Sequence, residues 1–71
     1  MARKPSFSNL ICNARKKRGL TVIEVAERVG VSPASIYFWE NDRVRPTDTN
    51  LSALCKVLKL PVRATKELAA G

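Results

Sequence analysis

The chain has 71 residues, enough for one domain but close to the lower size for a chain that forms its own hydrophobic core. Hydrophobic residues make up 45% of it, which indicates a globular protein, and the small core leaves little room for a buried catalytic pocket. Thirteen lysines and arginines oppose six acidic residues, and the net charge of +7 favours a polyanionic partner, either nucleic acid or an anionic membrane. Taken alone, the same charge is better explained by solubility.

The residue types exclude several kinds of site. There is no histidine, and Cys12 and Cys55 lie far apart without metal-ligand spacing. We therefore expect no metal site, no histidine-dependent catalytic triad and no cofactor, and no small-molecule ligand is evident. No apolar run is long enough for a signal peptide or a membrane span. The expectation is a cytoplasmic protein without a membrane partner, with two free thiols and no enzymatic activity.

Helix signals recur along the chain. Residues 1–6 form a basic arm without a pattern. The first helix is predicted from apolar residues at helical spacing, namely Phe7, Leu10, Ile11 and Ala14, and Gly19 is placed to end it. Thr21 and Glu24 form a capping box that opens a second helix, and Gly30 ends that helix.

Ser32 is a good N-cap and Pro33 a good first residue for a third helix, which runs to about Asn41. Residues 42–46 form a loop because Pro46 disfavours helical geometry at the residue before it. A fourth helix follows, for which Thr47, Asp48 and Thr49 all offer caps; its apolar stripe is Leu51, Leu54, Cys55 and Leu58. After Pro61, residues 62–70 form a short final helix. The prediction is an all-α, compact five-helix bundle, divided into an arm (1–6), a domain (7–60) and a short C-terminal helix or tail (61–71).

The segment 20–40, LTVIEVAERVGVSPASIYFWE, contains two short helices that meet at a tight turn. Gly30 supplies the backbone freedom that the turn requires, and Ala26 is small where the two helices would cross closely. These features describe a helix-turn-helix, although many helical hairpins would satisfy them.

A more specific pattern surrounds this segment. Its residues are Arg15, Gly19, Leu20, Thr21, Glu24, Ala26, Val29, Gly30, Val31, Ser32, Ser35, Ile36, Trp39, Glu40, Asn41, Arg43 and Pro46. The pattern resembles the phage repressor and Cro-type helix-turn-helix proteins, the XRE family, and the resemblance extends from the first helix to Leu60. It implies a lambda-repressor-like DNA-binding domain.

The resemblance implies that the helix Ser32 to Asn41 enters the major groove of DNA. The residues expected to face base edges are Ser32, Pro33, Ala34, Ser35, Tyr37 and Phe38. Ile36 and Trp39 should face the core, whereas for Phe38 core packing and DNA contact compete. The segment 32–38 lacks the Arg, Lys, Asn and Gln that usually pair with bases, so we expect apolar contacts with thymine, hydroxyl bonds, water bridges and DNA shape to matter.

The resemblance also implies that Arg15 and Glu40 form a structural ion pair between the first and third helices. The residues expected at DNA phosphates are Thr21, Val22, Lys17, Asn41, Arg43 and Arg45. For Lys16, Lys17 and Arg18 a solvated face is the alternative. Three positions depart from the family pattern: Val22 replaces a common Gln, and Asp42 and Lys59 stand where Gly is common.

The predicted function is sequence-specific binding of double-stranded DNA by a transcriptional regulator, expected to be a repressor. Symmetric half-sites are usual for the family, so a homodimer on DNA is expected, with residues after Leu60 as candidates for its interface. The alternative is a protein-interaction module on the same fold, such as an antitoxin-like or anti-repressor partner. The basic residues Arg43 and Arg45 argue against a purely protein-binding role.

Overall fold

The computed structural model describes residues 6–70, so nearly all of the basic arm lies outside the described residues. Five helices follow one another in the chain, and no strand occurs within this range. Their bounds are α1 Phe7–Lys17, α2 Val22–Val29, α3 Pro33–Glu40, α4 Asp48–Leu58 and α5 Val62–Ala70. The predicted all-α, five-helix fold is confirmed.

Side-chain caps begin four of the helices. Ser6, Thr21, Ser32 and Thr47 each accept a hydrogen bond from the backbone N–H three residues later. At α2 the capping box is complete, because Glu24 Oε1 also accepts from the backbone N–H of Thr21 at 3.0 Å. Of the three caps that the sequence offers α4, the structure uses Thr47. These bonds satisfy amide groups that have no partner inside the helix.

The helix ends that need left-handed backbone are occupied by two glycines and two larger residues. Gly30 ends α2 with a φ of 91°, which suits the sharp turn into α3. Asp42 and Lys59 adopt φ values of 58° and 55°, at the two positions where the family pattern often has Gly. Both residues therefore hold a conformation that costs a side chain with a Cβ about 1–2 kcal/mol.

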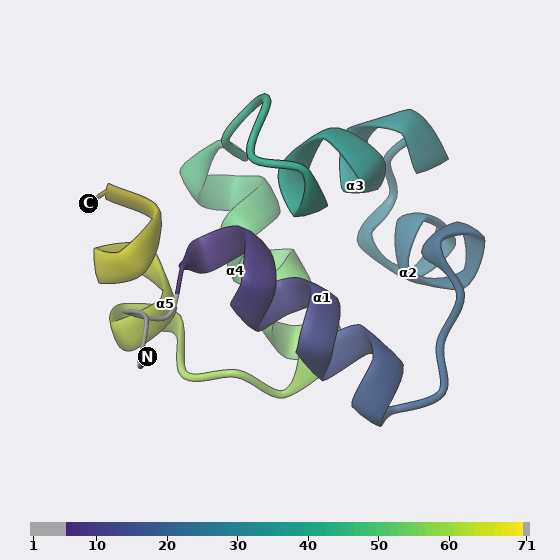
Figure 1. Cartoon of the computed structure of the whole chain (residues 1–71), viewed down its shortest axis with the longest axis horizontal. Coiled ribbons are helices and arrows are strands. Elements are labelled where there is room, and N and C mark those ends of the chain that lie inside the picture. Colours follow the sequence, from purple (N-terminus) through teal and green to yellow (C-terminus); the bar gives the residue numbers. More distant parts are fainter. Residues whose placement is uncertain (1–5, 71) are drawn as a thin grey trace, which may run out of the picture.

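The core lies between α1, α4 and the α2–α3 pair, and α5 closes its far side (Figure 1). α1 and α4 form the middle of the molecule, with α2 and α3 on one side and α5 on the other (Figure 1). The buried hydrophobic residues are Phe7, Ile11, Val25, Ala26, Ile36, Trp39, Leu51, Leu54, Cys55, Leu58 and Ala69. α3 packs against α1 and α2 with one face, and its opposite face is open to solvent.

Candidate nucleic-acid interface

The pair α2–α3 is joined by a tight turn at Gly30. The backbone N–H groups of Gly30 and Val31 both donate to the carbonyl of Ala26, at 2.8 and 3.0 Å. Ala26 itself is 1% exposed, so its small side chain is buried in the core. The turn thus fixes α3 at one orientation on the scaffold.

Helix α3 has a buried face and an open face. Ile36 and Trp39 are 1% and 4% exposed and belong to the core. Tyr37 and Phe38 are 59% and 44% exposed, and Pro33 and Ala34 are also exposed. Ser35, which the sequence assigns to base reading, is half-buried. The open face therefore presents the pyrrolidine ring of Pro33, the methyl group of Ala34 and the two aromatic side chains.

Three polar side chains at the two ends of α3 form local hydrogen bonds. Ser32 Oγ accepts from the backbone N–H of Ser35 at 3.4 Å and lies 3.2 Å from Ser35 Oγ. Asn41 Nδ2 donates to the carbonyl of Tyr37 at 2.7 Å. Three of the residues expected to contact DNA thus form local hydrogen bonds. Of these bonds, the sequence predicts only the N-cap at Ser32.

Arg15 and Glu40 lie against each other in two parallel hydrogen bonds. Arg15 Nε is 2.7 Å from Glu40 Oε2, and Arg15 Nη2 is 3.1 Å from Glu40 Oε1. The side chains are 14% and 9% exposed. Arg15 Nη1 also donates to the carbonyl of Leu20 at 2.9 Å, and the bond with Glu40 raises the pKa of the Arg15 guanidinium. One arginine therefore ties α1, the α1–α2 connection and the end of α3 together.

The loop that directly follows α3 carries two exposed cations. Arg43 and Arg45 are exposed, and neither forms an ion pair within residues 6–70. The backbone N–H of Arg43 donates to the carbonyl of Phe38 at 2.9 Å, which holds the start of the loop against the last turn of α3. Val44, between the two arginines, is 52% exposed.

At the start of α2, Thr21 is exposed and its hydroxyl and N–H are both used in the capping box. Val22, which stands where the family often has Gln, is half-buried and packs against the core. The side chain of Val22 is thus apolar and turned toward the scaffold, so a polar contact from this position is restricted to its backbone.

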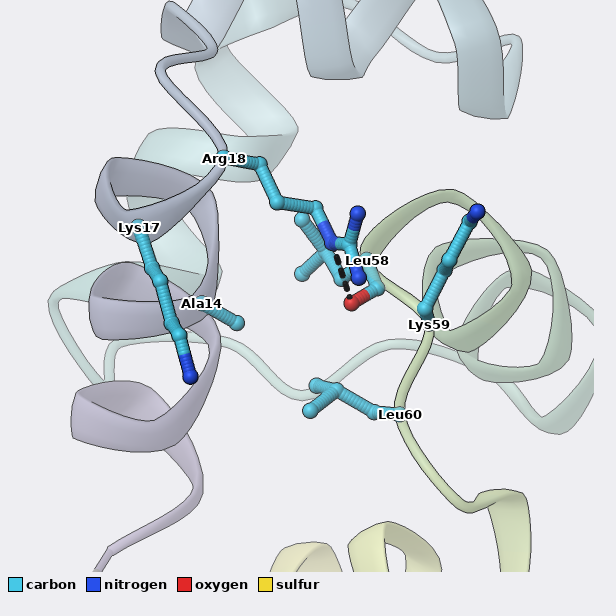
Figure 2. Close-up of a pocket in the computed structure, with 6 residues that line it drawn as sticks. All are labelled: Ala14, Lys17, Arg18, Leu58, Lys59 and Leu60. Atoms are coloured by element: carbon cyan, nitrogen blue, oxygen red, sulfur yellow. Dashed lines mark hydrogen bonds between the residues drawn. The ribbon is translucent and has the colours of Figure 1, made fainter.

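Lys17 lines a pocket of about 330 Å³ between the ends of α1 and α4 (Figure 2). The pocket is lined by Ala14, Lys17, Arg18, Leu58, Lys59 and Leu60. Arg18 reaches across it, and its Nε donates to the carbonyl of Leu58 at 2.9 Å (Figure 2). This bond between residues 40 positions apart has no signal in the sequence.

Residues 6–70 contain no group of three His, Cys, Asp or Glu side chains that could hold a metal ion. No helix in this range has the length and apolar character needed to cross a membrane. Cys12 and Cys55 are free thiols, the first half-buried and the second buried.

Comparison with known proteins gives a match to a family model described as helix-turn-helix, over residues 13–64. No curated protein matches the sequence significantly.

Three solved structures are similar over most of the chain. The DNA-binding domain of the P22 c2 repressor aligns with a TM-score of 0.83 and 28% identity, over 92% of this chain and 86% of that one. The clp gene regulator ClgR from Corynebacterium glutamicum gives 0.78 and 28%, over 92% and 69%. SinR, the master regulator for biofilm formation, in complex with DNA, gives 0.75 and 26%, over 84% and 97%.

Proposed function

Because the chain belongs to the helix-turn-helix family of phage repressor and Cro type, the XRE family, we propose that it is a transcriptional regulator that binds double-stranded DNA sequence-specifically. The observation that carries the proposal is the open face of α3, which is 59% exposed at Tyr37 and is followed in the chain by two exposed cations, Arg43 and Arg45, that form no ion pair within residues 6–70. A helix of this width fits the major groove of B-DNA. Its action is proposed to be repression, in the cytoplasm.

Within this proposal the residues divide into two groups. Ser32, Pro33, Ala34, Ser35, Tyr37 and Phe38 face base edges. Arg43 and Arg45, with Asn41, meet phosphates at the end of α3, and the first backbone amides of α2 at Thr21 and Val22 meet them at the other side. Lys17 contacts a phosphate from the end of α1. The assignment of the two arginines is supported most strongly by their exposure in the loop directly after α3, where the backbone N–H of Arg43 donates to the carbonyl of Phe38.

We further propose that two copies bind symmetric half-sites. The outer side of α5 supports this, because Val62 is 42% exposed and lies with Arg63, Lys66, Glu67 and Ala70 along a shallow depression of about 610 Å³. An apolar centre with charges of both signs around it can contact its own copy about a two-fold axis.

Selection of bound sequences from a random pool of duplex DNA tests the function. A regulator of this kind enriches one motif, and its symmetry and half-site spacing report the number of bound copies. Mobility shift of the enriched duplex against random competitor DNA then measures specificity. The matched control is the double variant Arg43→Glu, Arg45→Glu, which should lose binding while keeping the thermal stability of the parent. No enrichment, together with equal binding by parent and variant, would favour the protein-interaction module instead.

A further inference from the structure

The open face of α3 contains an apolar stripe made of Ala34 and Phe38. The two residues are four positions apart and therefore lie above one another on the same side of the helix. Both are exposed, and Phe38 presents 44% of its surface to solvent. Pro33 and Tyr37, also four apart and exposed, form the neighbouring stripe. A polar surface would be expected on a helix that reads bases through hydrogen bonds.

Local hydrogen bonds occupy part of the hydrogen-bonding capacity that the sequence leaves on this face. The hydroxyls of Ser32 and Ser35 lie 3.2 Å apart, and Ser32 also caps the helix. The amide of Asn41 turns back to the carbonyl of Tyr37. Among the residues expected to face bases, the Tyr37 hydroxyl is the one side-chain polar group without a hydrogen bond inside residues 6–70. The Tyr37 hydroxyl is thus the one such group whose hydrogen-bonding capacity is wholly free, and the two serine hydroxyls keep part of theirs.

One apolar group is available on the base edges of the major groove, the C5-methyl of thymine, and methylation at the same carbon gives 5-methylcytosine an equivalent group. We propose that α3 selects its DNA site by the C5-methyl groups of pyrimidines, which pack against Ala34 and Phe38. This inference rests on the proposed function and names the chemical feature that the interface reads. DNA is the occupant that the charges favour, because the loop that follows the stripe carries Arg43 and Arg45, which form no ion pair among the described residues, and the backbone N–H of Arg43 donates to the carbonyl of Phe38.

The size of the effect follows from the area of one methyl group. Transfer of one such group from water into an apolar contact changes a binding constant about fourfold. For a symmetric site with one contacted methyl group in each half, removal of both methyl groups should therefore lower the binding constant about sixteenfold. The effect is local, since the methyl group leaves the donors and acceptors of the base pair unchanged.

Substitution of deoxyuridine for thymidine tests the proposal, because it removes the methyl group and nothing else. The probe is the duplex enriched in the selection experiment, with each thymine replaced in turn and the dissociation constant measured. We expect about a fourfold loss at one or two thymines in each half-site. We define the thymine-to-uracil ratio at a position as the association constant for the duplex with thymine divided by that for the duplex with uracil. In Phe38→Ala this ratio should fall to one at one of these positions, whereas Phe38→Leu should retain it.

Two controls keep the result interpretable. Ile23→Ala also removes an exposed apolar side chain, 58% exposed but on α2, and should leave every thymine-to-uracil ratio unchanged. Thermal melting of Phe38→Ala should match the parent, which separates a lost contact from a lost fold. At each sensitive position, a duplex carrying 5-methylcytosine should bind about fourfold more tightly than the same duplex carrying cytosine.

The outcomes separate this inference from the proposed function. An enriched motif with ratios of one at all its thymines would overturn methyl reading and leave sequence-specific binding intact. Ratios of one combined with self-association that disappears in Phe38→Ala would instead assign the apolar stripe to a second copy of the chain. Failure to enrich any motif would overturn both.

Discussion

Arg15 and Glu40 meet edge to edge, 25 residues apart in the sequence, with both oxygens of the carboxylate facing the guanidinium. The bond joins the last helical turn of α1 to the last residue of α3. Since α3 carries the proposed reading face, this pair fixes the angle at which that face leaves the scaffold. Little solvent reaches the pair, so loss of one partner leaves a charge that water cannot fully stabilise.

Glu40→Ala should therefore lower the free energy of unfolding by about 3 kcal/mol, because Arg15 would remain as an uncompensated, mostly buried charge. Denaturation in urea measures the change. Lys66→Ala is the matched control: its pair with Asp48 spans 3.3 Å, and the side chains are 57% and 79% exposed. An exposed pair contributes under about 1 kcal/mol. If Glu40→Ala costs no more than Lys66→Ala, the pair does not hold α3.

Lys59→Gly should stabilise the protein by about 1 kcal/mol, because the left-handed conformation at the end of α4 strains any residue with a Cβ. Lys56→Gly, three residues earlier and inside the helix, should lower stability by about the same amount. Thermal melting of both variants gives the comparison. Equal losses in the two variants would show that position 59 gains nothing from glycine.

Thr65→Val should also raise stability, by about 1 kcal/mol. Thr65 is 0% exposed on the inner side of α5, and its Oγ1 has no hydrogen-bond partner in the described part of the chain. Replacing the hydroxyl by a methyl group of similar shape removes the penalty for burying an unpaired polar group. Thr65→Ala is the control, since it removes the hydroxyl and the methyl together and leaves a cavity. A loss of stability in Thr65→Val would mean that the hydroxyl has a partner.

Arg43→Ala should weaken binding to all DNA sequences alike. If Arg43 neutralises one phosphate per bound copy, the slope of log K against log salt should become shallower by about one per copy. Lys56→Ala removes an exposed cation from α4 and should leave the slope unchanged. Titrations at four or five salt concentrations measure both slopes. The same slope in Arg43→Ala as in the parent would remove this residue from the interface.

The capping box predicts how α2 responds to acid. Hydrogen bonding with Thr21, first of all from its backbone N–H, lowers the pKa of Glu24. Its contribution to stability is therefore complete above the unfolded value, about 4.3, and is lost as the pH falls through the lower folded value. Glu24→Gln should flatten stability between about pH 5 and pH 2, whereas Glu27→Gln, outside the capping box, should keep the parent's profile. Identical profiles for all three proteins would argue against the bond.

The helix boundaries could be predicted because each depends on residues close together in the chain. Thr21 and Glu24 begin α2 through bonds across three positions, and Gly30 ends it through its own backbone freedom. The contact of Arg15 with Glu40 depended on resemblance to a family, since no local rule joins residues 25 positions apart. Neither a local rule nor the family resemblance indicates the bond from Arg18 to the carbonyl of Leu58, and sequence reasoning missed it.

Side-chain conformation at the candidate site was also beyond the sequence. Asn41 is predicted to contact a phosphate because of its position, and the sequence does not indicate that its amide also donates to the carbonyl of Tyr37. Ser35 lies at the border between the two faces of α3, where a small rotation of the helix decides between burial and exposure. These choices depend on packing of α3 against α1 and α2, which a pattern of residue types does not specify.

Trp39 is the single tryptophan of the chain, and it lies 4% exposed beneath the outward side of α3. An indole in a dry interior emits at shorter wavelength than one in water, so its fluorescence is an internal reporter of the packed core. Ligands on the outer side of the helix leave this environment unchanged, whereas unfolding shifts the emission to longer wavelength. Folding and DNA binding can thus be followed in one sample without a label on the protein, the first by tryptophan emission and the second by anisotropy of labelled DNA.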